Sequence, residues 1–155
     1  MNLHKAQKLA MELMLLHGIT DYSFRWSRSR RAAGTCKYYS KIIQLSLPLT
    51  ELADERDVKD TILHEIAHAL CPGHGHDYVW QSKAKEIGAN GLRCYGMKGQ
   101  KESLVIAHQL IARYKGVCPN GHEHFKNRMP KRTHSCGRCS RKYDERYLIT
   151  YGLNV

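Results

Sequence analysis

The chain has 155 residues, of which 42% are hydrophobic and 25% are charged, a balance typical of a soluble protein with one domain, or with a small domain and a mini-domain. No apolar run reaches the ~20 residues of a membrane-spanning helix, which excludes a transmembrane protein, and the polar N-terminal residues indicate a protein that is not secreted. The formal net charge is +11, because 25 Lys and Arg outnumber 14 Asp and Glu.

The first predicted elements are one helix and two strands. Apolar residues at helical spacing predict a helix over residues 3–17. Two runs in which apolar and polar residues alternate, 22–26 and 38–46, predict a strand pair joined by a basic loop that contains Gly34. Pro48 ends the second predicted strand.

Three more helices are predicted before the amino-acid composition of the chain changes. They cover residues 54–70, 77–88 and 102–114. Beyond them, Cys, Gly, Pro, His and basic residues replace most aliphatic ones. We therefore expect an α+β fold, with a first domain of residues 1–115 and a small basic domain of residues 116–155.

The basic residues are concentrated in two segments. Residues 22–50 hold six Lys and Arg and no acidic residue, and residues 113–155 hold ten basic and three acidic residues. Residues 51–112, between them, hold seven basic and nine acidic residues. This distribution favours a polyanionic partner, for which nucleic acid is the default, over a merely solvated surface.

A zinc-binding pattern lies in the predicted helix 54–70. His64 and His68 are four residues apart and lie on one helix face, where both imidazoles can bind one Zn²⁺. Glu65 follows the first of them and is placed to accept the proton of a zinc-bound water molecule. The residues around this pattern are apolar, and such a helix would rarely carry two His and a Glu for packing alone.

A catalytic zinc site needs a third protein ligand and an open coordination position. His74 and His76 both follow the predicted metal-binding helix, in a glycine-rich turn that lets the chain fold back toward it. The residues alone leave both candidates open.

A second metal-binding pattern lies near the C-terminus. Cys136 and Cys139 form a CxxC pair, and Cys118 and His122 lie upstream at a distance suited to a second knuckle of the same site. Three Cys and one His close a tetrahedral zinc site with no open position, so this zinc is expected to be structural. The remaining cysteines have no evident pairing, and we expect reduced thiols in a cytoplasmic, nucleoid-associated or nuclear protein.

Segments along nearly the whole chain resemble SprT-like metalloproteases, the group that includes Spartan. The resembling segments are Phe24–Trp26, Gly34–Cys36, Ile42–Ser46, His64–Leu70 and the His-x-x-x-Trp element that follows. The resemblance implies a small zincin-like metalloprotease domain with a zinc ribbon behind it. It also implies that the substrate is protein, often protein bound to DNA.

The resemblance further selects the third zinc ligand. In SprT-like proteins this ligand stands four residues before a bulky aromatic residue, and a Gly follows eight residues after the aromatic. His76, with Trp80 and Gly88, fits both offsets, whereas His74 fits only the first. We therefore expect His76 to complete the catalytic site.

The resemblance also shows where the C-terminal pattern differs from the family. SprT-like proteins commonly carry CxxC at both knuckles of the ribbon, whereas this chain has Gly121 where the second Cys would stand and His122 one place later. His124 or His134 could therefore take the place of His122.

The expected function is that of a monomeric zinc endopeptidase that acts on DNA-associated proteins and holds one catalytic and one structural zinc ion. An edge strand near residues 38–46 could hold an extended substrate. The expected nucleic-acid contacts are Lys126, Arg128, Lys131, Arg132, Arg138, Arg141 and Lys142, which are interspersed with aromatic residues. The alternatives are a non-proteolytic nucleic-acid-binding module and a small-substrate metallohydrolase. Glu65 favours catalysis, since a structural zinc needs no carboxylate beside its ligand.

Overall fold

The computed structural model describes residues 1–93 and 102–155. The chain divides into two compact units, Met1–Ala107 (unit 1) and His108–Val155 (unit 2). This division falls within helix α5 (Glu102–Ile111), a few residues before the expected domain boundary at residue 115. No helix among the described residues is long and apolar enough to cross a lipid bilayer.

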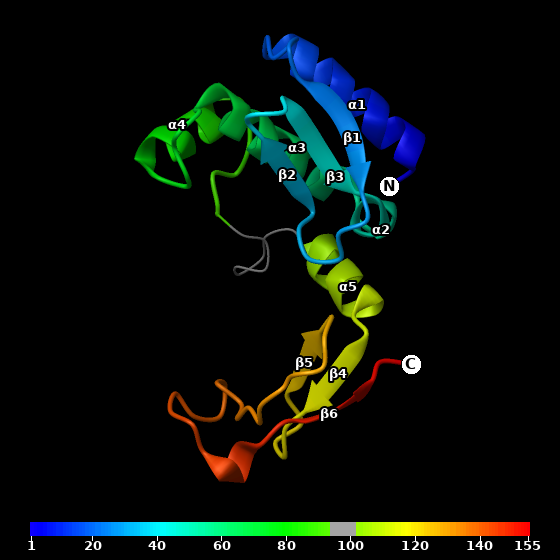
Figure 1. Ribbon diagram of the computed structural model, residues 1–155, viewed down its shortest axis with the longest axis vertical. Helices are drawn as coiled ribbons and strands as arrows, with labels where there is room; N and C mark the ends of the chain where they lie inside the picture. Colours follow the sequence, from blue (N-terminus) through cyan, green and yellow to red (C-terminus); the bar gives the residue numbers. More distant parts are fainter. Residues whose placement is uncertain (94–101) are drawn as a thin grey trace. The chain divides into compact units, whose positions relative to one another are not determined.

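The predicted α+β class is confirmed, because unit 1 packs helices on a small sheet (Figure 1). Its elements are α1 (Leu3–Leu16), β1 (Ser23–Ser27), β2 (Gly34–Lys37), β3 (Ile42–Ser46), α2 (Leu47–Leu52), α3 (Glu55–Leu70), α4 (Tyr78–Glu86) and the first part of α5. Helix α2 is absent from the sequence-based prediction, which used Pro48 only as the end of a strand. This proline lies in the first turn of α2, where the missing N–H costs no hydrogen bond.

The sheet differs from the predicted strand pair. Its order is β1-β3-β2, with β1 parallel and β2 antiparallel to β3. The prediction of one strand over 38–46 is wrong, since residues 38–41 form a turn in which Lys41 has a φ of +53°. The prediction of a substrate-binding edge at 38–46 is wrong as well, because β3 is paired on both sides. Among the described residues, β1 and β2 are the strands at the two edges of this sheet.

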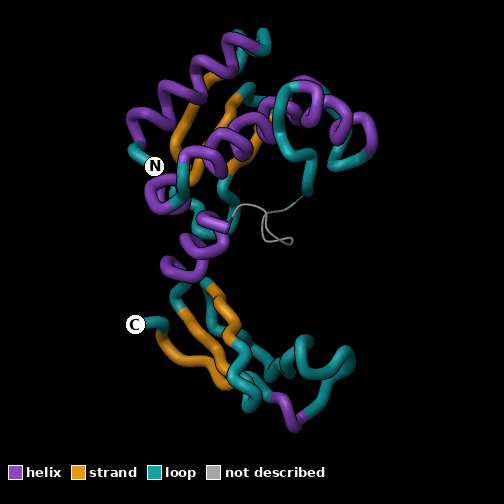
Figure 2. Tube along the Cα trace, turned by 180° about the vertical axis from the view of Figure 1, so that it is seen from behind, coloured by secondary structure: helices purple, strands orange, loops and turns teal. Residues whose placement is uncertain are grey.

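The two faces of the sheet have different surroundings. Ile43 and Leu45 of β3 are fully buried on the face that packs against α1 and α3, which lie on the same side of the sheet (Figures 1 and 2). On the opposite face, Arg25, Gln44 and Thr35 stand side by side across the three strands. Arg25 and Thr35 are exposed there, so this face of the sheet is polar and open to solvent.

Helix α3 carries the core of unit 1 on one side. Asp54 caps its N-terminus by accepting a hydrogen bond from the N–H of Asp57, and Ile62 and Ile66 are fully buried. The carboxylate of Asp57 is buried as well and accepts hydrogen bonds from the N–H and the hydroxyl of Ser103 at 3.1 and 2.7 Å. The start of α5 is thereby attached to the start of α3.

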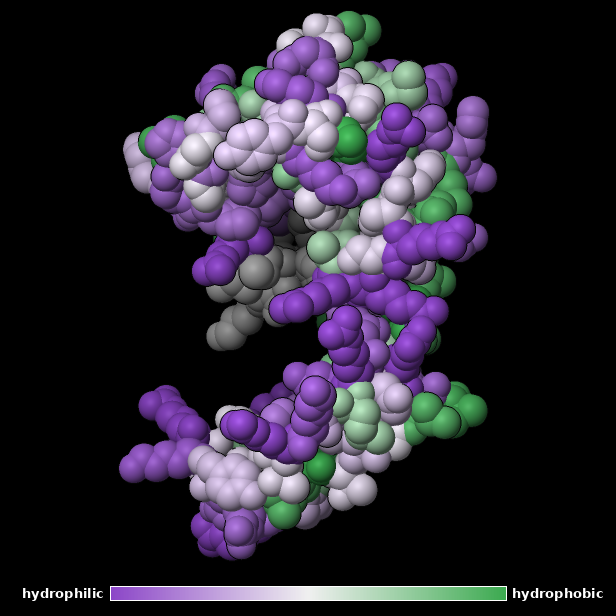
Figure 3. Space-filling model, in the orientation of Figure 1, coloured by the Kyte–Doolittle hydropathy of each residue, from purple (hydrophilic) through white to green (hydrophobic). Residues whose placement is uncertain are grey.

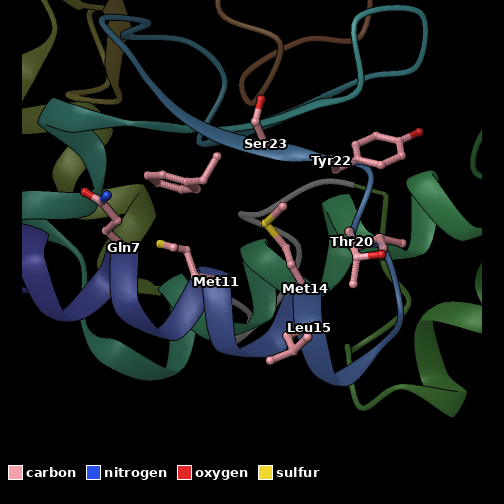
Figure 4. A pocket seen from close by; sticks show the side chains of 9 residues that line it. Gln7, Met11, Met14, Leu15, Thr20, Tyr22 and Ser23 are labelled. Atoms are coloured by element: carbon pink, nitrogen blue, oxygen red, sulfur yellow. The ribbon is translucent and has the colours of Figure 1, made fainter.

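A pocket of about 510 Å³ opens between α1 and the start of β1 (Figure 4). Its lining is mainly apolar and includes Met11, Met14 and Phe24. It contains none of the predicted zinc ligands.

Unit 2 is built on a second three-stranded sheet, in which β4 (Tyr114–Val117) lies between β5 (Glu123–Lys126) and β6 (Thr150–Leu153). Both pairings are antiparallel. At Gly116 a Cβ would lie 2.6 Å from side-chain atoms of both Ile149 and Tyr151, so this position has no room for a side chain. The segment between β5 and β6 carries a short 3-10 turn, Glu145–Tyr147.

Candidate active site and structural metal site

Three histidines converge beside the C-terminal half of α3. His64 and His68 come from successive turns of this helix, and His76 comes from the turn that precedes α4. The Nε2 atom of His76 lies 3.0 Å from Nε2 of His64 and 3.1 Å from Nε2 of His68. These three rings form one of the two groups of potential metal ligands among the described residues.

The geometry of this histidine cluster fits a zinc ion. Two imidazole nitrogens bound at ~2.0–2.1 Å to a tetrahedral ion lie about 3.3 Å apart, close to the separations observed here. Burial and, less strongly, the charge of His76 lower the pKa of His68 to about 4, against a smaller opposing effect of the backbone at His74. Burial also lowers the pKa of His76, with the positive charge of Arg93 acting in the same direction. Both rings are therefore neutral at pH 7, the form that binds metal.

Trp80 packs against all three rings from the first turn of α4. It is fully buried, stacks on His68 at 5.0 Å between ring centroids, and meets His64 and His76 edge to face at 4.6 Å each. The indole thus restricts the orientation of every ring in the cluster. The four-residue offset between His76 and Trp80 was used in the prediction only because the family shares it. The structure gives the offset a physical reason, since the Trp80 ring packs against the His76 ring.

The other candidate for the third ligand, His74, lies outside the cluster. Its Nδ1 atom is 2.7 Å from a carboxylate oxygen of Asp77. The second oxygen of Asp77 accepts a hydrogen bond from the N–H of Trp80 at 3.0 Å and so caps α4. His74 is therefore placed to support the start of α4, while His76 joins the other two histidines.

Glu65 lies between α3 and the sheet. It is only 6% exposed, and its side chain lies against Gly34, the first residue of β2. A Cβ at position 34 would lie 2.7 Å from Oε1 and 2.8 Å from Cγ of Glu65. Gly34 therefore provides the space that the Glu65 carboxylate occupies, a role that its place in a predicted loop gave no reason to expect.

Cys36, on the same face of β2 as Gly34, remains a thiol at neutral pH. Burial raises its pKa to about 11, and the nearby charge of Glu65 acts in the same direction. Cys36 is not part of the histidine group, so we do not assign it as a ligand.

A second cluster lies in unit 2 and contains Cys118, His122, Cys136 and Cys139. The Sγ atoms of Cys118 and Cys139 are 3.8 Å apart, and Nδ1 of His122 lies 3.2–3.5 Å from the three sulfurs. Zn–S bonds of ~2.3 Å at tetrahedral angles predict about 3.8 Å between two sulfurs and about 3.6 Å between a sulfur and a nitrogen. The distances match a four-coordinate zinc site.

Tight turns favour metal binding at this second cluster. Burial alone would raise the pKa of Cys118 and Cys136, but backbone N–H groups that follow each cysteine lower both values below the usual one. Burial, together with hydrogen bonds from the other two thiols, raises the pKa of Cys139 to about 11. His122 joins the cluster, whereas His124 and His134 do not.

The two clusters predict two zinc ions with different behaviour. Fully loaded protein should contain two zinc ions by metal analysis, one that exchanges readily and one that is tight. Cys136→Ser should remove the tight zinc and loosen unit 2, because structural zinc contributes folding free energy. The histidine cluster should keep its zinc in this variant. A content of one zinc ion in loaded protein would eliminate one of the two sites.

The expected nucleic-acid contacts all lie on unit 2 and are exposed. They are Lys126, Arg128, Lys131, Arg132, Arg138, Arg141 and Lys142. None of them forms an ion pair within the part of the chain that the structure describes. Their charges are thus available to an anionic partner.

Comparison with known proteins gives one family. A model of the SprT-like family matches residues 5–101, which include all three histidines and Glu65. Among solved structures, the metallopeptidase zymogen jannalysin of Methanocaldococcus jannaschii is similar, with 15% sequence identity and a TM-score of 0.49 over 65% of this chain and 90% of that chain. No curated protein matches this sequence.

Proposed function

This chain belongs to the SprT-like family, and we propose that it is a zinc-dependent endopeptidase that acts on DNA-associated proteins. The observation that carries the proposal is the convergence of three histidines, with Nε2 of His76 at 3.0 and 3.1 Å from those of His64 and His68. Glu65 is adjacent to His64 in the chain and is buried beside the sheet. Three His ligands leave one tetrahedral position open, which is the arrangement of catalytic zinc sites. A purely structural site has no need of an open position.

The roles of the residues follow from this arrangement. His64, His68 and His76 would hold the zinc ion, which when bound polarises a peptide carbonyl and lowers the pKa of water toward ~7. Glu65 acts as the general base that takes the proton of the attacking water and returns it to the leaving amine. The buried position of this carboxylate keeps it oriented for both transfers.

The free edge of β2 is the surface that we propose for the substrate. Within residues 1–93 and 102–155, β2 pairs with β3 on one side only, and its first residue lies against Glu65. An extended peptide that adds to this edge gains main-chain hydrogen bonds that do not depend on its side chains. Such binding suits an enzyme with varied protein substrates.

Nucleic acid is the proposed partner that brings substrates to the enzyme. The expected contact residues of unit 2, all of them exposed cations, support this proposal, together with aromatic neighbours such as Tyr143. Figure 3 shows hydrophilic side chains that project from unit 2. Phosphate contacts of this kind give affinity without sequence preference.

The charge pattern predicts how binding to single-stranded DNA responds to salt and to substitution. Affinity should fall steeply with salt, with a slope of about 0.7 per phosphate contact on a logarithmic plot. The double variant Lys131→Glu, Arg132→Glu should weaken binding and flatten this slope by about 1.4, measured by fluorescence anisotropy at several salt concentrations.

The matched control reverses two cations on the open sheet face of unit 1. Arg25→Glu combined with Lys37→Glu changes the net charge by the same amount, and should leave the affinity close to that of the parent. If this control weakens binding while the unit 2 variant does not, the contact surface belongs to the sheet of unit 1.

A non-proteolytic nucleic-acid-binding module is the alternative function, because both metal clusters and the positive charge would serve it equally. Zinc-dependent cleavage of a protein substrate, assayed with and without single-stranded DNA, separates the two. Cleavage would support the endopeptidase function. Glu65 distinguishes the two functions, because only the endopeptidase needs a general base.

A further inference from the structure

The second ring nitrogen of His68 has a specific partner in unit 1. Nδ1 of His68 lies 3.3 Å from the hydroxyl oxygen of Tyr38, and both side chains are partly buried. Tyr38 follows the last residue of β2 directly and lies thirty positions before His68. This contact therefore joins the end of the edge strand to the helix that carries two of the three histidines.

The chemistry of a metal-bound imidazole gives this contact a direction. When Nε2 of His68 binds zinc, the single ring proton resides on Nδ1, which then donates to the hydroxyl oxygen of Tyr38. A partner at this nitrogen selects the tautomer, holds the ring plane and increases the basicity of the ligand nitrogen. Stacking on Trp80 restricts the same ring but supplies no hydrogen bond to it.

We propose that Tyr38 is a positioning residue of the zinc site, which orients His68 through its hydroxyl group. The proposal rests on the proposed function in one respect, namely that the histidine cluster binds zinc. Because Gly34 begins β2 against Glu65 and Tyr38 follows its end against His68, this short strand supports both the general base and one ligand. The strand proposed to bind substrate is thus also the strand that orders the catalytic groups.

The test compares two neighbouring tyrosines. Tyr38→Phe removes the hydroxyl and keeps the ring, and Tyr39→Phe makes the same change on a side chain that is fully exposed. Zinc affinity of the histidine site is measured by competition with a chromogenic chelator, with the tight zinc of unit 2 in place. Tyr38→Phe should weaken this affinity by about 10–100-fold, the usual effect of losing an outer-shell partner, and Tyr39→Phe should not change it.

Two further measurements separate positioning from other roles. At saturating zinc, kcat of Tyr38→Phe should approach that of the parent, because the ligands are then forced into place by the metal. The thermal stability of the metal-free protein should be similar for both variants. If the hydroxyl of Tyr38 had only a structural role, its removal would lower that stability.

Equal zinc affinities of Tyr38→Phe and the parent overturn the proposal. A lower kcat at saturating zinc with unchanged zinc affinity also overturns it, and would assign the hydroxyl to the substrate instead. If the parent itself takes up no zinc at the histidine site, the proposed function fails, and this result is distinct from either of the others.

Discussion

Glu65→Gln should lower the rate of protein cleavage by about 10²–10⁴-fold while both zinc ions remain bound. The amide has nearly the size of the carboxylate and still forms hydrogen bonds, so it fits the space beside Gly34 without repacking. It cannot accept a proton, and the attacking water therefore loses its general base. The rate is measured on a protein substrate, and any self-cleavage is followed in the same reaction.

The control for this variant is its metal content, because zinc loss would also abolish cleavage. Metal analysis and thermal unfolding should give the parent's values, since Glu65 is not one of the clustered ligands. If Glu65→Gln cleaves as fast as the parent, the activity belongs to another site or to a contaminant.

His76→Ala should lose the exchangeable zinc, and with it all zinc-dependent cleavage. Two histidines on one helix then remain as ligands, which is fewer than the three of a catalytic zinc site. Removal of an outer-shell partner lowers zinc affinity by about 10–100-fold. The loss of zinc affinity in His76→Ala should be larger, because this substitution deletes a ligand itself. Zinc stoichiometry after dialysis measures the effect, with the zinc of unit 2 as an internal reference.

His74→Ala is the matched control for this substitution, two positions away in the same turn. It should retain the zinc, because its ring contacts Asp77 and lies outside the histidine cluster. It removes a partner of the residue that caps α4, so a modest loss of stability is expected. Zinc retained by His76→Ala and lost by His74→Ala would reverse the assignment of the third ligand.

The parts of the fold that could be predicted depend on local spacing. Helix α3 agrees with its prediction, because apolar residues repeat at helical spacing and Asp54 is a strong N-cap. The facing positions of His64 and His68 follow from the same helix period. The Cys136 and Cys139 pair is similarly local, and the distances in unit 2 match what its spacing indicated.

The features that could not be predicted depend on contacts between distant residues. Strand β2 has four residues, too few for alternation to distinguish it from a loop, and its role becomes visible only where Gly34 meets Glu65. The parallel pairing of β1 with β3 is likewise a tertiary property. Tyr38 lay in a predicted strand, and no motif connects it with a histidine thirty positions later.

The choice between His74 and His76 illustrates the same limit. Both follow the metal helix in a glycine-rich turn, and the residues alone gave no preference. The structure separates them because Asp77 contacts the first ring while Trp80 packs against the second. A pair of contacts around the start of α4 therefore decides which histidine reaches the cluster.

The central claim is that the three histidines hold a zinc ion that is required for proteolysis. The most direct test is removal of the exchangeable zinc by a chelator, followed by titration with zinc, while cleavage of a protein substrate is measured with single-stranded DNA present and absent. We expect no cleavage by the depleted protein and full recovery at one equivalent of zinc per chain. Fully loaded protein that cleaves nothing under either DNA condition would contradict the claim and identify the chain as a nucleic-acid-binding module.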